Sequence, residues 1–489
     1  MDRIRLSKNE YMDKVLACWL GKNIGGTLGT PVEGIKYTHA FTYYDWDVTR
    51  RWKKDPSWTP GEPLQNDDLD FQLVWVKMLE DRGIHVKFRD FADYWLKHLH
   101  KHWYAEYSFC IYNLQRGLMP PVSGAFQNYW VDEMGSPIRS EIWACVAPAD
   151  PQLAASLAWM DSSLDHTGGE GRWGEMFWAA AESAAFVTKD PMTLIKIGLS
   201  MIPISCSIAR SVREAVWCFE NKLDWGEARE RIATIFGHVQ PCNAIPNHGF
   251  AVIGLLYGKD YGDILCKAVN CGFDTDCTGA TLGSLLGIMG GTAGIPEEWK
   301  KPVGYAITPC AQTIMDGLPK TISELTERTA KIAEKLLKER SGTSEFGEKA
   351  VLPENILSLL FRNEKIGKLL TFDNNCAVEN IEDAEIALHY NGEPVLYPGI
   401  EKTLDVSVRK GGSAVMPEIE IKAPAGWSVS KPEKVQGLGR FSVSAKTVEN
   451  KNALEITVKA EGKTAKASFT LLGPGAVKLL PAAQSAPQS

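Results

Sequence analysis

The cysteines of this chain form no recurring pattern. Eleven of them are scattered singly through 489 residues, without a Cys-x-x-Cys pair and without regular spacing. Such a set does not describe a disulfide framework and favours reduced thiols in a cytoplasmic protein. The N-terminus also lacks an apolar leader before a cleavage site, so we expect a cytoplasmic location. Removal of a signal peptide would instead make the protein secreted or periplasmic.

Basic residues are slightly outnumbered by acidic ones. Lysine and arginine number 53 against 60 acidic residues, which gives a net charge of −7. This balance gives no reason to expect nucleic acid as a partner. No continuous run of apolar residues approaches the roughly 20 that span a membrane, so we expect no membrane association. The composition, 44% hydrophobic and 23% charged, is that of an ordinary soluble protein long enough for two or more domains. It does not indicate an oligomeric state.

Two acidic clusters stand where apolar-periodic helices are predicted to begin. The first is Asn-Asp-Asp-Leu-Asp at residues 66–70, and the second is Asp-Thr-Asp-Cys at residues 274–277. Either one alone is explained by helix capping, because carboxylate and amide oxygens accept the free N–H groups of a first helical turn. Together they offer several hard oxygen ligands, which suit Mg, Ca or Mn.

A glycine-rich stretch ends the first predicted helix. Gly21, Gly25 and Gly29 recur every four residues, and Glu33 follows in a loop after a Thr-Pro pair. Two interpretations are open: the glycines form a backbone wall for a ligand, or they allow close packing of a second helix. A lone loop glutamate is usually just solvated. Glu33 becomes a candidate for a functional residue only because it follows the glycine-rich stretch in a chain that also carries the two acidic clusters.

In this order, residues 21–34, 66–68 and 274–277 resemble the three motif blocks of the ADP-ribosylglycohydrolase (DraG-like) family. The resemblance covers roughly residues 8–310. It implies an all-α orthogonal helical bundle around a binuclear Mg²⁺ or Mn²⁺ centre, with catalysis by Glu33 and Asp68. The metal ligands that it implies are Asn66, Asp67, Asp68, Asp274, Asp276 and Cys277.

The chain departs from the family at two of these positions, where Asn66 and Cys277 stand in place of the usual threonines. A thiol is a poor ligand for Mg²⁺. The resemblance also points to Arg139, His166 and Asn247 as substrate-binding residues. Arg139 suits a phosphate or carboxylate, although a structural ion pair is as common. His166 precedes a threonine where the family has the reverse order.

A loop between the first two motif blocks is unusually aromatic. Two alternatives are open: the rings form a stacking surface for a sugar or base, or they pack the loop against the domain. The residues concerned are Tyr37, Phe41, Tyr43, Tyr44, Trp46, Trp52 and Trp58.

The pattern changes near the C-terminus. From residue 384 apolar residues alternate with polar ones in six or seven short segments separated by turn signals, which predicts a small immunoglobulin-like β-sandwich. Residues 423–429 resemble sandwich modules appended to bacterial glycosidases, so we expect a supporting role. The predicted organisation is a helical catalytic domain at 1–340, a linker at 341–380, the β-sandwich at 381–475 and a disordered tail at 476–489.

These observations predict a metal-dependent glycoside hydrolase of the ADP-ribosylglycohydrolase superfamily. Its substrate would be a small molecule or carbohydrate with an N- or O-glycosidic bond at ADP-ribose or a related sugar. The alternative is a non-catalytic, crystallin-like binding or structural protein that retains the fold.

Overall fold

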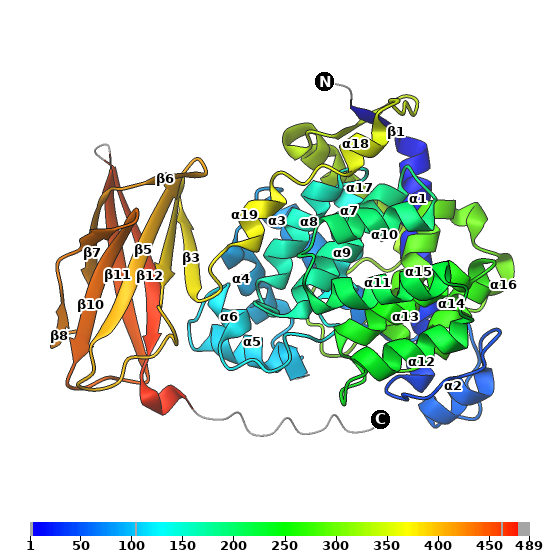
Figure 1. The fold of residues 1–489 in the computed structure, drawn as a ribbon, viewed down its shortest axis with the longest axis horizontal. Helices are drawn as coiled ribbons and strands as arrows, with labels where there is room; N and C mark the ends of the chain where they lie inside the picture. Colours follow the sequence, from blue (N-terminus) through cyan, green and yellow to red (C-terminus); the bar gives the residue numbers. More distant parts are fainter. Residues whose placement is uncertain (1–2, 103–104, 461–462, 478–489) are drawn as a thin grey trace. The chain divides into compact units, whose positions relative to one another are not determined.

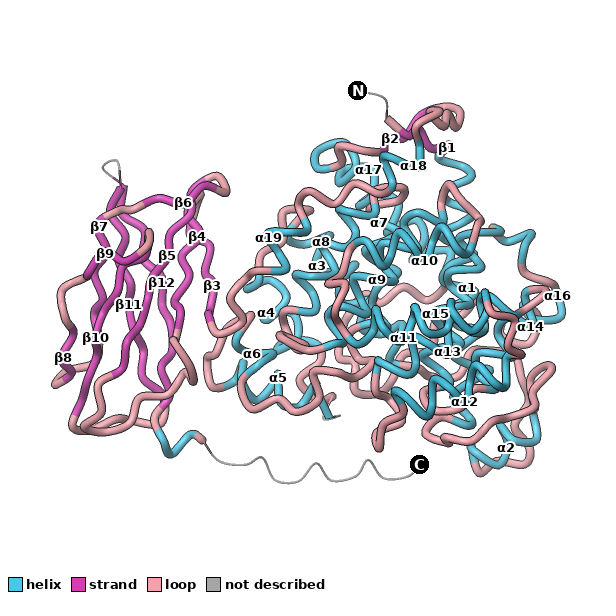
Figure 2. Tube along the Cα trace, in the orientation of Figure 1, coloured by secondary structure: helices cyan, strands magenta, loops and turns pink. Residues whose placement is uncertain are grey.

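The computed structural model describes residues 3–102, 105–460 and 463–477. Contacts divide the chain into two compact units. The first consists of Met1–His85, Asp132–Trp159 and Gly169–Thr371, and the second of Val86–Val131, Met160–Gly168 and Phe372–Ser489. Helices dominate the first unit, and the strands of the second are magenta in Figure 2. A helical part followed by antiparallel sheets confirms the predicted fold class.

The helices of the first unit run through most of its length. In chain order they are α1 (Lys8–Gly29), η1 (Thr30–Val32), α2 (Trp46–Lys53), α3 (Asp67–Arg82), η2 (Pro137–Arg139), α7 (Ser140–Val146), α9 (Glu170–Ala185), α10 (Pro191–Ser200), α11 (Ser207–Glu220), α12 (Trp225–Phe236), α13 (Ala244–Tyr257), α14 (Tyr261–Asn270), α15 (Thr275–Gly290), η3 (Thr292–Gly294), α16 (Glu297–Lys300), α17 (Ile322–Arg340), α18 (Ile356–Leu360) and α19 (Ile366–Leu370). Helix α8 (Pro151–Ser162) continues from the first unit into the second.

Helices α1 and α15 pack backbone against backbone (Figure 1). A Cβ atom added at Gly25 would lie 1.9 Å from the carbonyl oxygen of Gly279, and one added at Gly21 would lie 1.9 Å from that of Gly283. Both distances are far below any van der Waals contact, so only glycine fits. Because α15 fills this face of α1, the glycines serve helix packing and do not form a wall for a ligand.

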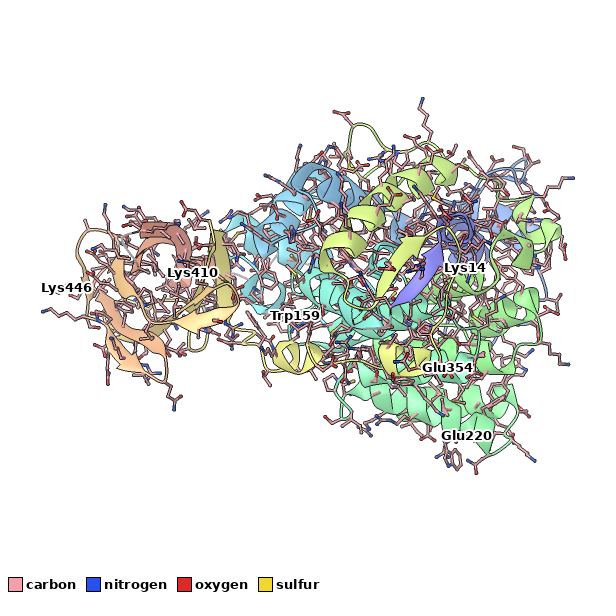
Figure 3. All side chains as sticks on the ribbon, turned by 90° about the horizontal axis from the view of Figure 1, so that it is seen from above. Lys14, Trp159, Glu220, Glu354, Lys410 and Lys446 are labelled. Carbon is pink, nitrogen blue, oxygen red and sulfur yellow. The ribbon has the colours of Figure 1, made fainter. Side chains whose placement is uncertain are left out.

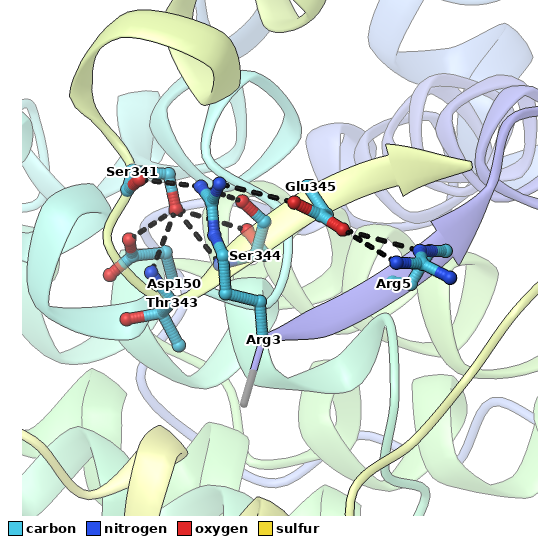
Figure 4. A network of polar contacts seen from close by, with 7 residues as sticks. All are labelled: Arg3, Arg5, Asp150, Ser341, Thr343, Ser344 and Glu345. Carbon is cyan, nitrogen blue, oxygen red and sulfur yellow. Dashed lines mark hydrogen bonds and ion pairs between the residues drawn. The ribbon is translucent and has the colours of Figure 1, made fainter. Parts of the chain in front are cut away.

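The N-terminus of the first unit is tied to the segment after α17 (Figure 4). Strand β1 (Ile4–Ser7) pairs in parallel with β2 (Ser344–Gly347). The guanidinium of Arg3 donates to the backbone oxygens of Ser341 and Ser344 at 2.6 and 2.8 Å, and to the carboxylate of Glu345 at 3.1 Å. Arg5 also reaches Glu345, at 3.1 Å. The two ends of the helical part are thereby held together.

The second unit contains helices and all the remaining strands. They are α4 (Phe88–His98), α5 (Ala105–Gln115), α6 (Val122–Ala125), β3 (Cys376–Ile381), β4 (Ala384–His389), β5 (Lys402–Lys410), β6 (Ser413–Val415), β7 (Glu418–Lys422), β8 (Trp427–Val429), β9 (Glu433–Val435), β10 (Leu438–Ala445), β11 (Lys451–Ala460), β12 (Lys463–Leu472) and η4 (Pro474–Ala476). The helices of this unit contact strand β3: Arg89 on α4 forms an ion pair with the buried Glu379, donating to it from Nε at 2.8 Å.

The strands form two antiparallel sheets. One has the order β3-β4-β5-β10-β8, with β6 added to β5 and β9 to β10, and the other has the order β12-β11-β7. Buried and less buried residues alternate along β10 and β11, as expected of strands with one face in a core. That core includes Leu404, Phe441 and Ile456, whereas the Lys446 side chain lies outside (Figure 3).

Some predicted boundaries fall within ordered elements. Residues 341–380 contain β2, α18, α19 and most of β3. Of the predicted disordered tail, residues 478–489 lie outside the described residues. None of the helices in the described part of the chain combines the length and apolarity that crossing a membrane requires.

Candidate metal and active site

Two loops of the first unit bring the first and third motif blocks together. The N–H of Gly34 donates to the carbonyl oxygen of Phe273 at 2.9 Å, and the N–H of Phe273 donates to that of Ile35 at 2.8 Å. Phe273 adopts a left-handed backbone conformation, with φ +69°, which is uncommon for a bulky residue. The loop carrying Glu33 is therefore fixed beside Asp274, at the start of α15.

Asn247, on α13, supports the start of α15. Its side-chain oxygen accepts the N–H of Asp274 at 3.2 Å, and its amide nitrogen donates to the backbone oxygens of Pro241 and Asn243 at 2.7 and 2.8 Å. The side chain is fully buried. The structure thus places this predicted substrate-binding residue next to the acidic cluster, where it positions Asp274.

Asn66 joins the two acidic clusters. As the N-cap of α3, its side-chain oxygen accepts the N–H of Asp68 at 2.8 Å. Its amide nitrogen donates to a carboxylate oxygen of Asp276 at 3.3 Å. The N-termini of α3 and α15 therefore meet.

The cluster contains buried carboxylate oxygens that find no donor within the described residues. They are Oδ2 of Asp68, both oxygens of Asp274 and Oδ1 of Asp276. These side chains are 1%, 1% and 6% exposed. An uncompensated buried carboxylate costs several kcal/mol, and a divalent cation supplies the missing charge to several oxygens at once. The residues present therefore fit a divalent cation.

Mutual repulsion is visible in the pKa values of the cluster. Burial, followed by repulsion from Asp276 and Glu33, raises the pKa of Asp274 well above its ordinary value. Repulsion by Asp276, followed by desolvation and repulsion by Asp67 and Asp68, does the same to the pKa of Glu33, although its side chain still reaches solvent. Carboxylates that repel one another in this way attract a cation.

Behind Asp68 lies a buried charged network that the sequence did not reveal. The ammonium of Lys22 on α1 contacts a carboxylate oxygen of Glu141 on α7 at 2.8 Å, and both side chains are buried. The amide of Gln72 on α3 donates to the other Glu141 oxygen, also at 2.8 Å. Burial alone would lower the pKa of Lys22, but attraction by Glu141 and Asp68 raises it, so Lys22 stays charged. It opposes the rise in the Asp68 pKa that burial causes.

Two thiols contact the carboxylates. The Sγ–H of Cys277 donates to Oδ1 of Asp68 at 3.4 Å, and that of Cys242 to Oε1 of Glu33 at 3.8 Å. Cys277 was expected here from its motif. Cys242 was not, because it lies in a separate loop before α13 and no sequence signal connects it with the acidic motifs.

Two of the predicted substrate-binding residues have buried side chains that pair with acidic groups. Arg139 is fully buried, donates from Nη1 to the carbonyl oxygen of Gly135 at 2.8 Å and lies 3.8 Å from Glu175. These contacts are those of a structural ion pair. His166 belongs to the second unit, where it is fully buried with Nδ1 3.1 Å from Asp165.

The aromatic loop packs against α16. The ring of Tyr44 stacks on Trp46 with centroids 4.5 Å apart and lies 5.0 Å from Trp299. Its hydroxyl donates to the carbonyl oxygen of Trp299 at 3.1 Å, and that of Tyr43 donates to that of Glu298 at 2.6 Å. These contacts favour packing over a stacking surface for a ligand.

Asp70, at the end of the first acidic motif, should make the stability of the protein depend on pH. One of its oxygens accepts the N–H of Cys310 and the hydroxyl of Thr313 at 2.8 and 2.7 Å, and burial raises its pKa to about 7. Because the folded state holds the Asp70 proton more tightly than the unfolded state does, the protonated carboxyl contributes to the free energy of unfolding at low pH. This contribution to stability is lost as the pH rises from about 4 to about 7.

Urea unfolding with EDTA tests this expectation. The free energy of unfolding of Asp70→Asn, relative to the unsubstituted protein, should rise by at most roughly 4 kcal/mol between pH 4 and 7. A difference that does not change with pH would contradict the assignment.

The fold and the site together define a mainly helical domain with a buried acidic site suited to divalent cations. The chain belongs to the ADP-ribosylglycohydrolase family, whose model matches residues 7–344. This confirms the resemblance seen in the sequence and supports a hydrolase of that superfamily.

Individual relatives are distant. An uncharacterized protein of Archaeoglobus fulgidus is 23% identical over 297 residues, covering 59% of this chain and 90% of that protein. A solved structure described as an ADP-ribosylglycohydrolase-related protein complex is 20% identical with a TM-score of 0.43, covering 68% of this chain and all of that one. The family assignment rests on the family model.

Proposed function

We propose that this protein is a divalent-cation-dependent glycoside hydrolase acting on an N- or O-glycosidic bond at ADP-ribose or a related sugar. The observation that carries the proposal is the set of buried oxygens on Asp68, Asp274 and Asp276 that find no hydrogen-bond partner among the described residues, beside the solvent-accessible Glu33. A structural protein gains nothing from such a cluster, because unpaired buried charge lowers stability.

Four carboxylates would hold the cation. Asp67 and Asp68 come from the start of α3, and Asp274 and Asp276 from the start of α15. Their oxygens suit Mg²⁺ or Mn²⁺, and a binuclear centre is the arrangement that the family resemblance implies. When bound, the metal would supply positive charge that orients and polarises the sugar hydroxyls.

Glu33 is the proposed acid and base. Its carboxyl group reaches solvent beside Asp274, so Glu33 can protonate the leaving group as the glycosidic bond breaks. The resulting carboxylate can then accept a proton from the attacking water. Asp68 lies deeper, with one oxygen held by the Cys277 thiol, and we assign it the orientation of that water.

Asp274→Asn tests the cation site independently of any substrate. The substitution removes one charge from the repelling cluster, so the melting temperature of the metal-free protein should rise. The additional stabilisation by Mg²⁺ or Mn²⁺ should disappear, because a ligand stabilises only the state that binds it. Thermal shifts with each metal and with EDTA measure both effects. Asp316→Asn, at an exposed position, is the control and should leave both unchanged.

Substrate assays then test the reaction. With metal present, release of ADP-ribose from modified protein and cleavage of a panel of ribosides and other glycosides should reveal at least one activity that EDTA abolishes. Metal binding without any such cleavage would favour a non-catalytic protein that keeps the fold. Absence of metal binding would contradict the proposed function altogether.

A further inference from the structure

The thiols of the acidic site differ from most others in the chain. Of the eleven cysteines, eight are buried and three are partly exposed, namely Cys242, Cys277 and Cys310. Cys277 and Cys242 contact Asp68 and Glu33 of the site, and Cys310 interacts with Asp70 at the end of the first acidic motif. A ligand that enters the site from solvent can therefore reach their sulfur atoms.

The geometry allows a thiol to share a cation with the carboxylates. One oxygen each from Asp274 and Asp276 and the sulfur of Cys277 all lie within 4.8 Å of one another. The same holds for Glu33, Cys242 and Asp274. Ligands bound to one zinc ion at about 2.0–2.3 Å are separated by roughly 3–4 Å, so small side-chain movements suffice. Asp274 belongs to both groups, and both of its oxygens lack partners among the described residues.

A sulfur ligand changes which metal is preferred. Mg²⁺ takes oxygen ligands and binds thiolates poorly, whereas Zn²⁺ and Co²⁺ accept sulfur and carboxylate oxygen together. A thiol that served only as a hydrogen-bond donor would leave the preference to the carboxylates. The ligand set of this chain is thus not that of a pure magnesium site.

We propose that Cys277, together with Asp274 and Asp276, makes this a centre for a sulfur-binding divalent metal such as Zn²⁺ in preference to Mg²⁺. Cys242 supplies a second thiol at the neighbouring position beside Glu33 and Asp274. This inference rests on the proposed function, because it assumes that the acidic site holds a divalent cation.

Cobalt provides a direct test on the full-length protein. Metal-free protein titrated with Co²⁺ should develop the near-ultraviolet absorption of thiolate-to-cobalt charge transfer. Zn²⁺ should displace cobalt and abolish the band at far lower concentration than Mg²⁺. Calorimetric titration with each metal alone gives the two affinities without any assay of activity.

Substitution of the sulfur identifies the ligand. Cys277→Thr should greatly weaken the band and lower Zn²⁺ affinity by tenfold or more, while Mg²⁺ binding persists, because the hydroxyl is an oxygen ligand. Any remaining band should vanish in the double variant Cys277→Thr/Cys242→Ser. Cys218→Ser, at a thiol on α11 outside the acidic site, is the control and should retain the full band.

The outcomes separate this inference from the proposed function. Tight Mg²⁺ binding without a cobalt band, or a band that survives in the double variant, would overturn the preference for sulfur-binding metals and leave the cation-dependent hydrolase intact. Failure of every divalent metal to bind would overturn both. We expect the unsubstituted protein to show the cobalt–thiolate band and the Asp274→Asn variant to bind none of the divalent metals.

Discussion

Replacing Gly25 by alanine is expected to lower the free energy of unfolding by about 3 kcal/mol, a large effect for the addition of one methyl group. The new Cβ would lie 1.9 Å from the carbonyl oxygen of Gly279 and 2.6 Å from the nitrogen of Ala280, so the backbones of α1 and α15 must separate. Both helices lead to the site, since Glu33 follows α1 and Asp274 begins α15. Metal affinity should therefore fall together with stability.

Gly290→Ala is the matched control for this experiment. Gly290 lies at the end of the same helix α15, and a Cβ there would meet no atom within 4 Å. Alanine restricts the unfolded chain and favours helix, so this variant should be as stable as the parent or gain up to about 1 kcal/mol. Urea unfolding of both variants measures the difference. Equal stability of the two variants would show that the helices separate at no cost.

Glu33→Gln should reduce kcat by about 10²–10⁴-fold, the usual contribution of a general acid or base. The amide keeps the size of the side chain but cannot transfer the proton. It also removes a charge that Asp276, Asp67 and Asp68 repel, so the metal-free variant should melt at a higher temperature. Activity falls while stability rises, a combination that a merely structural role for Glu33 would not produce.

Two further measurements make this prediction specific to proton transfer. The thermal shift caused by the divalent metal should persist in Glu33→Gln, because Asp67, Asp68, Asp274 and Asp276 remain. Glu62→Gln, at an exposed position of the aromatic loop, should leave kcat unchanged. Full kcat in the Glu33→Gln variant would show that another group, not Glu33, is the general acid and base.

The parts of the site that could be predicted are those that lie in short sequence motifs, at residues 66–70 and 274–277. Acidic residues at two predicted helix starts mark Asp68 and Asp274, and the capping interpretation does not hold at Asp274, whose side chain makes no cap hydrogen bond. The role of Gly25 stayed open, since glycine spacing looks the same whether a ligand or a helix fills the groove. Only the partner helix, distant in sequence, decides between them.

Other features left no pattern to recognise. Cys242 has no acidic neighbour in the chain, and its place in the site depends on how the loop before α13 folds back onto Glu33. Lys22 and Glu141 are an ordinary lysine and glutamate in helices until tertiary packing buries both. The alternating strands after residue 384 were predictable, whereas their grouping with residues 86–131 depends on long-range contacts such as that of Arg89 with Glu379.

The pairing of β1 with β2 has a consequence for synthesis of the chain. Ile4 lies beside Ser344, so β1 leaves the ribosome long before its partner exists. At about 5–20 residues per second, β2 follows tens of seconds later, and α15 reaches α1 only shortly before. During that interval β1 and the glycine face of α1 lack their partners, although α1 can already contact α7 through Lys22 and Glu141. The helical part therefore completes its folding late in translation, and its first residues depend on its last.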